Sequence, residues 1–167
     1  MRPSLEEVRK LRSEGNVIPV YKSIVADFLT PVSAFLKLQE GCRYAFLLES
    51  VEGGEQLARY SFLGRDPFLI CTIGTGPGKT ADGSEHRRFA ADDREGFFGA
   101  VRETMNRFQS VTLPGLPPFT GGGVGFFGYD MVRLIEDVPS TGTDDLAVDD
   151  AALMFYKTIL AFDHVRN

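Results

Sequence analysis

Cysteine is scarce in this sequence, and long hydrophobic runs are absent. The two cysteines, Cys42 and Cys71, belong to no CxxC pair and have no neighbouring histidine, which argues against a zinc site. Both stand among apolar residues, as buried free thiols do in a reducing compartment. No apolar run approaches the roughly 18 residues that a membrane helix needs, and the charged first residues do not resemble a signal peptide. We therefore expect a cytoplasmic protein without a membrane partner.

An excess of basic residues is also missing. Eighteen Lys and Arg stand against 23 Asp and Glu, which gives a net charge of −5, and the basic residues are dispersed. Three acidic pairs, Asp92-Asp93, Asp144-Asp145 and Asp149-Asp150, repel phosphate locally, so nucleic acid is not an expected partner. The 167 residues, 43% of them hydrophobic, suffice for one domain with a buried core.

Three helices are predicted, over residues 4–14, 30–41 and 92–108. Ser4 should cap the first through a capping box with Glu7. The second should begin at Thr30 with Pro31 at its first position, and the third should be capped by Asp92 together with Glu95. The predicted buried face of the third helix, at helical spacing, comprises Phe97, Val101, Met105 and Phe108.

Strand patterns lie between and after these helices. Three short apolar segments, 44–51, 59–63 and 68–73, are divided by glycine and proline and predict an antiparallel meander. Asp82-Gly83 is a predicted hairpin turn. Further strands are expected over 16–25 and 151–165, an extended segment over 120–128, and a short helix over 129–136. This order lacks regular βαβ alternation, so we predict an α+β fold with a mainly antiparallel sheet and a few packing helices.

Two glycine-rich segments match nucleotide-binding motifs in part only. The segment from Gly74 to Thr80 lacks the first glycine of a phosphate-binding loop, because Ile73 stands there. Residues 123–128 match GxGxxG, but a proline-rich segment precedes them where a dinucleotide site requires a central strand. We expect these glycines to permit close backbone packing instead. His86 and His164 have no neighbours at metal-binding spacing, so surface or structural roles are expected for both, and neither a metal site nor a catalytic site is predicted.

One group of residues could bind a ligand. Glu49 and Ser50 end one apolar segment, and Arg59, Tyr60 and Ser61 begin the next. If the two segments pair, a carboxylate for an ammonium group and donors for a carboxylate meet beside an apolar wall, which suits a zwitterionic amino acid. The alternative is a solvated hairpin end with a surface Arg–Glu pair, and the pattern alone favours that alternative.

Three blocks of sequence resemble the N-terminal region of anthranilate synthase component I. They are residues 47–64, which begin Leu-Leu-Glu-Ser, residues 119–133 and residues 154–165, and they follow one another in the order of that family. The resemblance implies a partial fold of the large subunit, with residues 1–167 as its regulatory region and the chorismate-binding catalytic region beyond Asn167.

The resemblance also implies a function. The family converts chorismate and an amino-group donor to anthranilate and pyruvate, with Mg²⁺ as cofactor and a glutamine amidotransferase subunit as the ammonia source. L-Tryptophan inhibits at a separate site, which the resemblance places at Ser50, with Leu48 and Glu49 beside it. Weaker candidates are Arg59, Tyr60 and Ser61. No cofactor is expected in residues 1–167 themselves.

Alternatives remain open at this stage. The large subunit of aminodeoxychorismate synthase shares this N-terminal layout, although Glu-Ser-Val-Glu-Gly-Gly at 49–54 favours anthranilate synthase. The chain could also be a stand-alone amino-acid-binding module, or a scaffold that only supports a catalytic region. Because the predicted strand 151–165 would be left bare without the rest of the protein, we expect the isolated chain to self-associate.

Overall fold

The computed structural model describes residues 1–49, 59–74, 85–139 and 142–165. Its helices are α1 (Leu5–Leu11), α2 (Pro31–Leu38), α3 (Arg94–Arg107) and the 3₁₀ helix η1 (Tyr129–Leu134). Its strands are β1 (Ala45–Leu48), β2 (Tyr60–Arg65), β3 (Leu69–Ile73), β4 (Glu85–Phe89), β5 (Gly122–Phe127), β6 (Ala151–Tyr156) and β7 (Leu160–Asp163).

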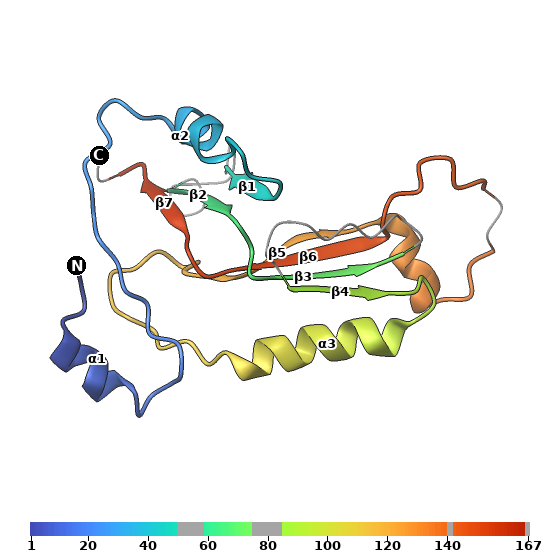
Figure 1. Cartoon of the computed structure of the whole chain (residues 1–167), viewed down its shortest axis with the longest axis horizontal. Coiled ribbons are helices and arrows are strands. Elements are labelled where there is room, and N and C mark those ends of the chain that lie inside the picture. The colour runs from blue at the N-terminus through green and yellow to red at the C-terminus, as the bar shows by residue number, and fades with distance from the viewer. Residues whose placement is uncertain (50–58, 75–84, 140–141, 166–167) are drawn as a thin grey trace.

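The strands form two sheets, which lie side by side along the molecule (Figure 1). The smaller sheet has the order β1-β2-β7 and is antiparallel throughout. The larger has the order β4-β3-β6-β5 and is antiparallel except for the parallel pair β3–β4. The chain passes from one sheet to the other between β2 and β3 and again between β6 and β7. The predicted α+β class with mainly antiparallel sheet is confirmed.

The core lies between α3 and one face of the larger sheet (Figure 1). Leu69, Cys71 and Ile73 alternate along β3, so their side chains point to the same face and meet Phe97 of the helix. Cys71 is a fully buried free thiol, as predicted, and burial raises its pKa. The same prediction is wrong for Cys42, which is only half-buried and donates to the carbonyl oxygen of Tyr44 at 3.0 Å.

The helix caps follow local sequence closely. The capping box of Ser4 and Glu7 and the Thr30 cap with Pro31 behind it are confirmed. At α3 the cap is Asp93 rather than Asp92, because the Asp93 carboxylate accepts from the Gly96 N–H at 3.0 Å.

The predicted buried face of α3 is wrong in its second half. Phe97, Ala100 and Thr104 are the buried residues, whereas Met105 is 55% exposed and Phe108 is 38% exposed. The helix is therefore turned so that Thr104, and not Met105, is buried. The Thr104 hydroxyl donates to the Ala100 carbonyl oxygen at 2.8 Å, so its burial leaves no polar group without a partner.

Three strand predictions need correction because pairing partners lie far away in sequence. Residues 16–25 form no strand and make only isolated bridges such as Val17–Ser110. The meander over 44–73 stops after β1 and β2, because β3 joins the other sheet. The segment 151–165 is two strands, a central β6 and an edge β7, which separate at residues 157–159.

The predicted turn at Asp82-Gly83 lies outside the described residues. The strands on either side of it, β3 and β4, run parallel, with Leu69 opposite Glu85 and Ile73 opposite Phe89. A tight hairpin joins antiparallel strands, so β3 and β4 are not the two arms of one hairpin.

Candidate functional site

The end of β1 and the start of β2 lie together at one end of the smaller sheet. Leu48 is opposite Phe62 in the β1–β2 ladder, so Glu49 follows beside the first residues of β2. The predicted pairing of these two segments is therefore confirmed. Leu48 is 47% exposed and Glu49 is exposed, so both are open to a ligand or to a covering segment. Ser50 lies outside the described residues.

Arg59 forms an ion pair, but with a different carboxylate from the one predicted. Its Nε lies 2.9 Å from Oδ1 of Asp163, and its Nη2 lies 2.7 Å from Oδ2. These hydrogen bonds raise the pKa of the Arg59 guanidinium. The guanidinium also lies over the Tyr60 ring, 4.9 Å from its centre. Two parallel hydrogen bonds hold a guanidinium in one orientation, so Asp163 of β7 fixes the start of β2.

The Ser61 side chain on β2 is buried. It is 2% exposed, and its Oγ lies 2.7 Å from Nε2 of His164. This contact agrees with the surface or structural role expected for His164. Asp163, the last residue of β7, holds Arg59, and His164, in the turn that follows, contacts Ser61. Sequence inspection missed Asp163, and the signal that could have found it is the pairing of β2 with β7, where Tyr60 stands opposite Asp163.

Aromatic rings form the apolar wall beside these polar groups. The Tyr60 and Phe62 rings are 6.0 Å apart, and Phe62 meets Phe119 edge to face at 5.5 Å. Phe119 in turn contacts Phe46 of β1 at 6.4 Å. An apolar wall of the kind predicted for an amino-acid site thus lies beside Tyr60 at the start of β2.

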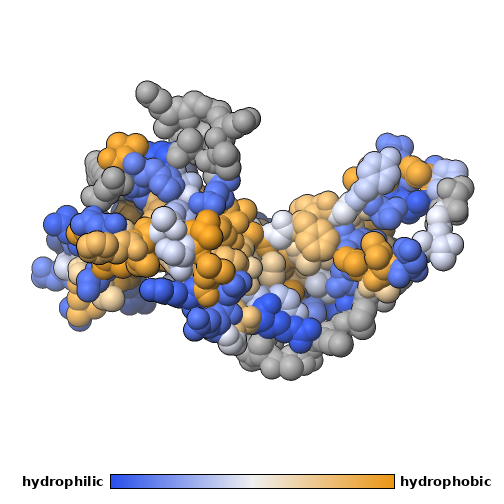
Figure 2. Space-filling model, turned by 90° about the horizontal axis from the view of Figure 1, so that it is seen from above, coloured by the Kyte–Doolittle hydropathy of each residue, from blue (hydrophilic) through white to orange (hydrophobic). Residues whose placement is uncertain are grey.

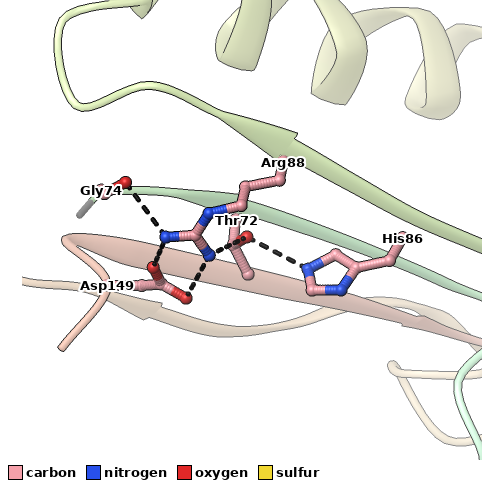
Figure 3. Close-up of polar contacts among 5 residues, drawn as sticks. All are labelled: Thr72, Gly74, His86, Arg88 and Asp149. Carbon is pink, nitrogen blue, oxygen red and sulfur yellow. Dashed lines mark hydrogen bonds and ion pairs between the residues drawn. The ribbon is translucent and has the colours of Figure 1, made fainter. Parts of the chain in front are cut away.

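A second polar cluster lies on the larger sheet (Figure 3). Arg88 of β4 donates to both carboxylate oxygens of Asp149, at 2.7 and 3.3 Å, and to the Gly74 carbonyl oxygen at 3.1 Å. Thr72 lies 3.1 Å from Nε2 of His86. The cluster joins β4, β3 and the segment before β6, which agrees with the surface or structural role expected for His86.

The acidic segment before β6 carries a perturbed carboxyl group. Burial raises the pKa of Asp150, and the neighbouring carboxylates of Asp130, Asp144 and Asp149 raise it further, while Arg133 lowers it. Within the described ranges, no three His, Cys, Asp or Glu side chains are arranged to hold a metal ion.

The GxGxxG match at residues 123–128 lies on β5 and its end, not at a strand-to-helix turn. A Cβ on Gly125 would strike the Ala152 carbonyl oxygen of β6, so only glycine fits there. The predicted role in close packing is confirmed. In the segment from Gly74 to Thr80, which partly matches a phosphate-binding loop, residues 75–80 lie outside the described part of the chain. No helix in the described part of the chain has the length and apolar character to cross a membrane.

The chain is similar to several curated proteins. It is 38% identical over 166 residues to anthranilate synthase component 1 of Acetivibrio thermocellus, an alignment that covers 99% of this chain and 33% of that protein. The proteins of the same name from Acinetobacter calcoaceticus and Pseudomonas aeruginosa are 38% and 39% identical, over 98% and 96% of this chain and 34% and 32% of theirs. The chain thus spans about a third of the length of these relatives.

No family profile matches the chain. A solved structure of anthranilate synthase component I from Streptococcus pneumoniae TIGR4 is 25% identical, with a TM-score of 0.48, over 88% of this chain and 30% of that one.

Proposed function

Because this chain is homologous to a third of anthranilate synthase component 1, we propose that it is the regulatory, tryptophan-binding N-terminal part of such a subunit. The observation that carries this proposal is 38% identity over 99% of the chain. The whole protein would convert chorismate and ammonia to anthranilate and pyruvate, with a glutamine amidotransferase subunit as partner. Mg²⁺ would bind in the remaining two-thirds of the protein.

Exposed hydrophobic side chains support the proposal that further protein covers this part of the subunit. Figure 2 shows hydrophobic side chains over the half of this face that carries α2 and β1, and toward the larger sheet. Large apolar residues exposed by about half include Val32, Leu36, Leu48 and Phe126. Exposed apolar patches of this kind mark interaction surfaces, which supports a covering segment of further protein.

We place the tryptophan site where β1 ends and β2 begins. Glu49 would accept from the ligand ammonium, Ser50 would donate to the ligand, and Leu48 and Tyr60 would contact the indole. Arg59, held by Asp163, would orient the Tyr60 ring. Ser61 is buried and bound to His164, so it would support the site rather than touch the ligand. These side chains form one wall only, so the isolated chain should bind tryptophan weakly.

Inhibition of the full-length enzyme tests this site. Ser50→Phe fills the proposed pocket, and Glu49→Gln removes the acceptor for the ammonium group. Loss of a hydrogen bond to a charged group costs about 1.5–3 kcal/mol, so each should raise the tryptophan inhibition constant about 10- to 150-fold. The uninhibited rate should stay close to that of the parent enzyme. Glu136→Gln, at an exposed position near η1, is the matched control. Unchanged inhibition in both test variants would remove this segment from the site.

The product and the activity of the isolated chain test the rest of the proposal. The full-length enzyme should release fluorescent anthranilate from chorismate, Mg²⁺ and ammonium, and accumulation of aminodeoxychorismate would favour the related synthase. The 167-residue chain alone should form no anthranilate above background. Calorimetry that finds micromolar tryptophan binding to the chain alone would identify a self-sufficient binding module instead.

A further inference from the structure

A cavity of about 400 Å³ is lined by residues from the C-terminal end of α3 and from the first residues of β3 and β4. The end of α3 passes these strands in Figure 1. Its volume falls in the range of about 300–1,000 Å³ that is usual for small-molecule sites. The cavity belongs to the larger sheet, whereas the proposed tryptophan site belongs to the smaller one.

Two aromatic rings and two cations form one side of this cavity. The Phe68 and Phe108 rings meet edge to face, with centres 5.4 Å apart. The Lys157 ammonium lies 4.8 Å from the centre of the Phe68 ring, and the Arg107 guanidinium lies 5.6 Å from that of Phe108. A ring face attracts a cation without neutralising it, so each cation is held in place while its charge is retained.

The charges that line the cavity do not cancel. Arg87 is bound by both lining carboxylates, Glu85 at 2.8 Å and Glu103 at 3.3 Å. No carboxylate among the described residues is within ion-pair distance of Arg107 or Lys157. Three cations against two carboxylates leave an excess of one positive charge, and the C-terminal end of α3 offsets only about half a charge. The cavity therefore attracts an anion.

We propose that this cavity binds a small carboxylate that carries a flat aromatic ring. The ligand carboxylate would contact Arg107 and Lys157, and its ring would pack against Phe68 and Phe108. Arg87 would stay bound to its two glutamates and shape the opposite wall. This proposal does not depend on the proposed tryptophan site.

Benzoate is the simplest probe of this site, and benzamide is its uncharged counterpart. Saturation-transfer NMR titrations of the full chain should show benzoate binding with a Kd on the order of 1 mM, as expected for a ligand of this size. Arg107→Gln and Lys157→Gln should each weaken binding about tenfold, whereas Lys157→Arg should retain it. Arg102→Gln, on an exposed turn of the same helix, is the matched control and should not change binding.

Three results would overturn the proposal: no benzoate binding at 20 mM by the folded parent (about 20 times the expected Kd), benzamide binding as tightly as benzoate, or equal weakening by Arg102→Gln. Arg107 and Lys157 are exposed, so their variants should keep the parent's far-UV circular dichroism spectrum. Failure of these titrations would leave tryptophan inhibition of the full-length enzyme untouched.

Discussion

Removal of the Phe97 ring is the sharpest test of how α3 packs. Phe97 is fully buried, and its ring meets those of Phe89, Phe98 and Phe127 edge to face at 6.0, 5.3 and 6.4 Å. Phe97→Ala would lose the burial and leave a cavity among rings from three other positions. Such truncations cost about 3–5 kcal/mol, a large part of the roughly 5–15 kcal/mol that holds a domain folded.

Urea unfolding followed by circular dichroism measures this loss, with thermal unfolding as a second readout. For a domain of this size the melting temperature should fall by about 6–20 °C, taking about 2–4 °C per kcal/mol. The matched control is Met105→Ala on the same helix, where the side chain is 55% exposed. Surface truncation of this kind should cost less than about 1 kcal/mol.

Helical spacing alone places Phe97 and Met105 on one face, whereas the structure buries only Phe97. The two variants therefore distinguish the sequence-based prediction from the structure. If Met105→Ala proves as costly as Phe97→Ala, the helix is rotated differently from the structure and the packing argument fails. A change in the dependence of unfolding free energy on urea concentration would instead indicate that the variant altered the unfolded state.

Other perturbations follow from the same structure. A double-mutant cycle of Arg88→Met and Asp149→Asn should give a coupling free energy of about 1–3 kcal/mol by urea unfolding, and additive effects would refute the pair. Gly125→Ala should destabilise the β5–β6 pairing in the same assay, whereas Gly99→Ala, in open space on α3, should stabilise by about 0.5–1 kcal/mol. Because the folded-state pKa of Asp150 is raised, its stabilising effect is present below its usual pKa and is lost as pH rises. Asp150→Asn should therefore gain stability over the parent at neutral pH but not at pH 3, and the opposite order would contradict the assigned pKa direction. Light scattering over a concentration series should show self-association of the chain through β7, which among the described strands pairs with β2 only, and a strict monomer would contradict this prediction.

The sequence by itself determined the features that depend on residues a few positions apart. Ser4 and Glu7 cap α1 through contacts three residues apart, and Thr30 with Pro31 begins α2 in the same way. The β1–β2 hairpin and the extended glycine-rich strand β5 were likewise predictable, since alternation and turn residues are local signals. Part of the candidate site followed from this hairpin, which places Glu49 beside the first residues of β2.

Tertiary structure decided which strands pair and where the remaining polar groups find partners. Asp163 and Arg59 are 104 residues apart, and only the docking of β7 beside β2 brings them together. The parallel pairing of β3 with β4, the separation of 151–165 into strands of two sheets and the rotation of α3 all depend on what each segment packs against. Helical spacing predicts that Phe97 and Met105 share one face of α3. Which part of that face is buried depends on the sheet against which the helix packs, because burial depends on the shape and volume of the opposing surface.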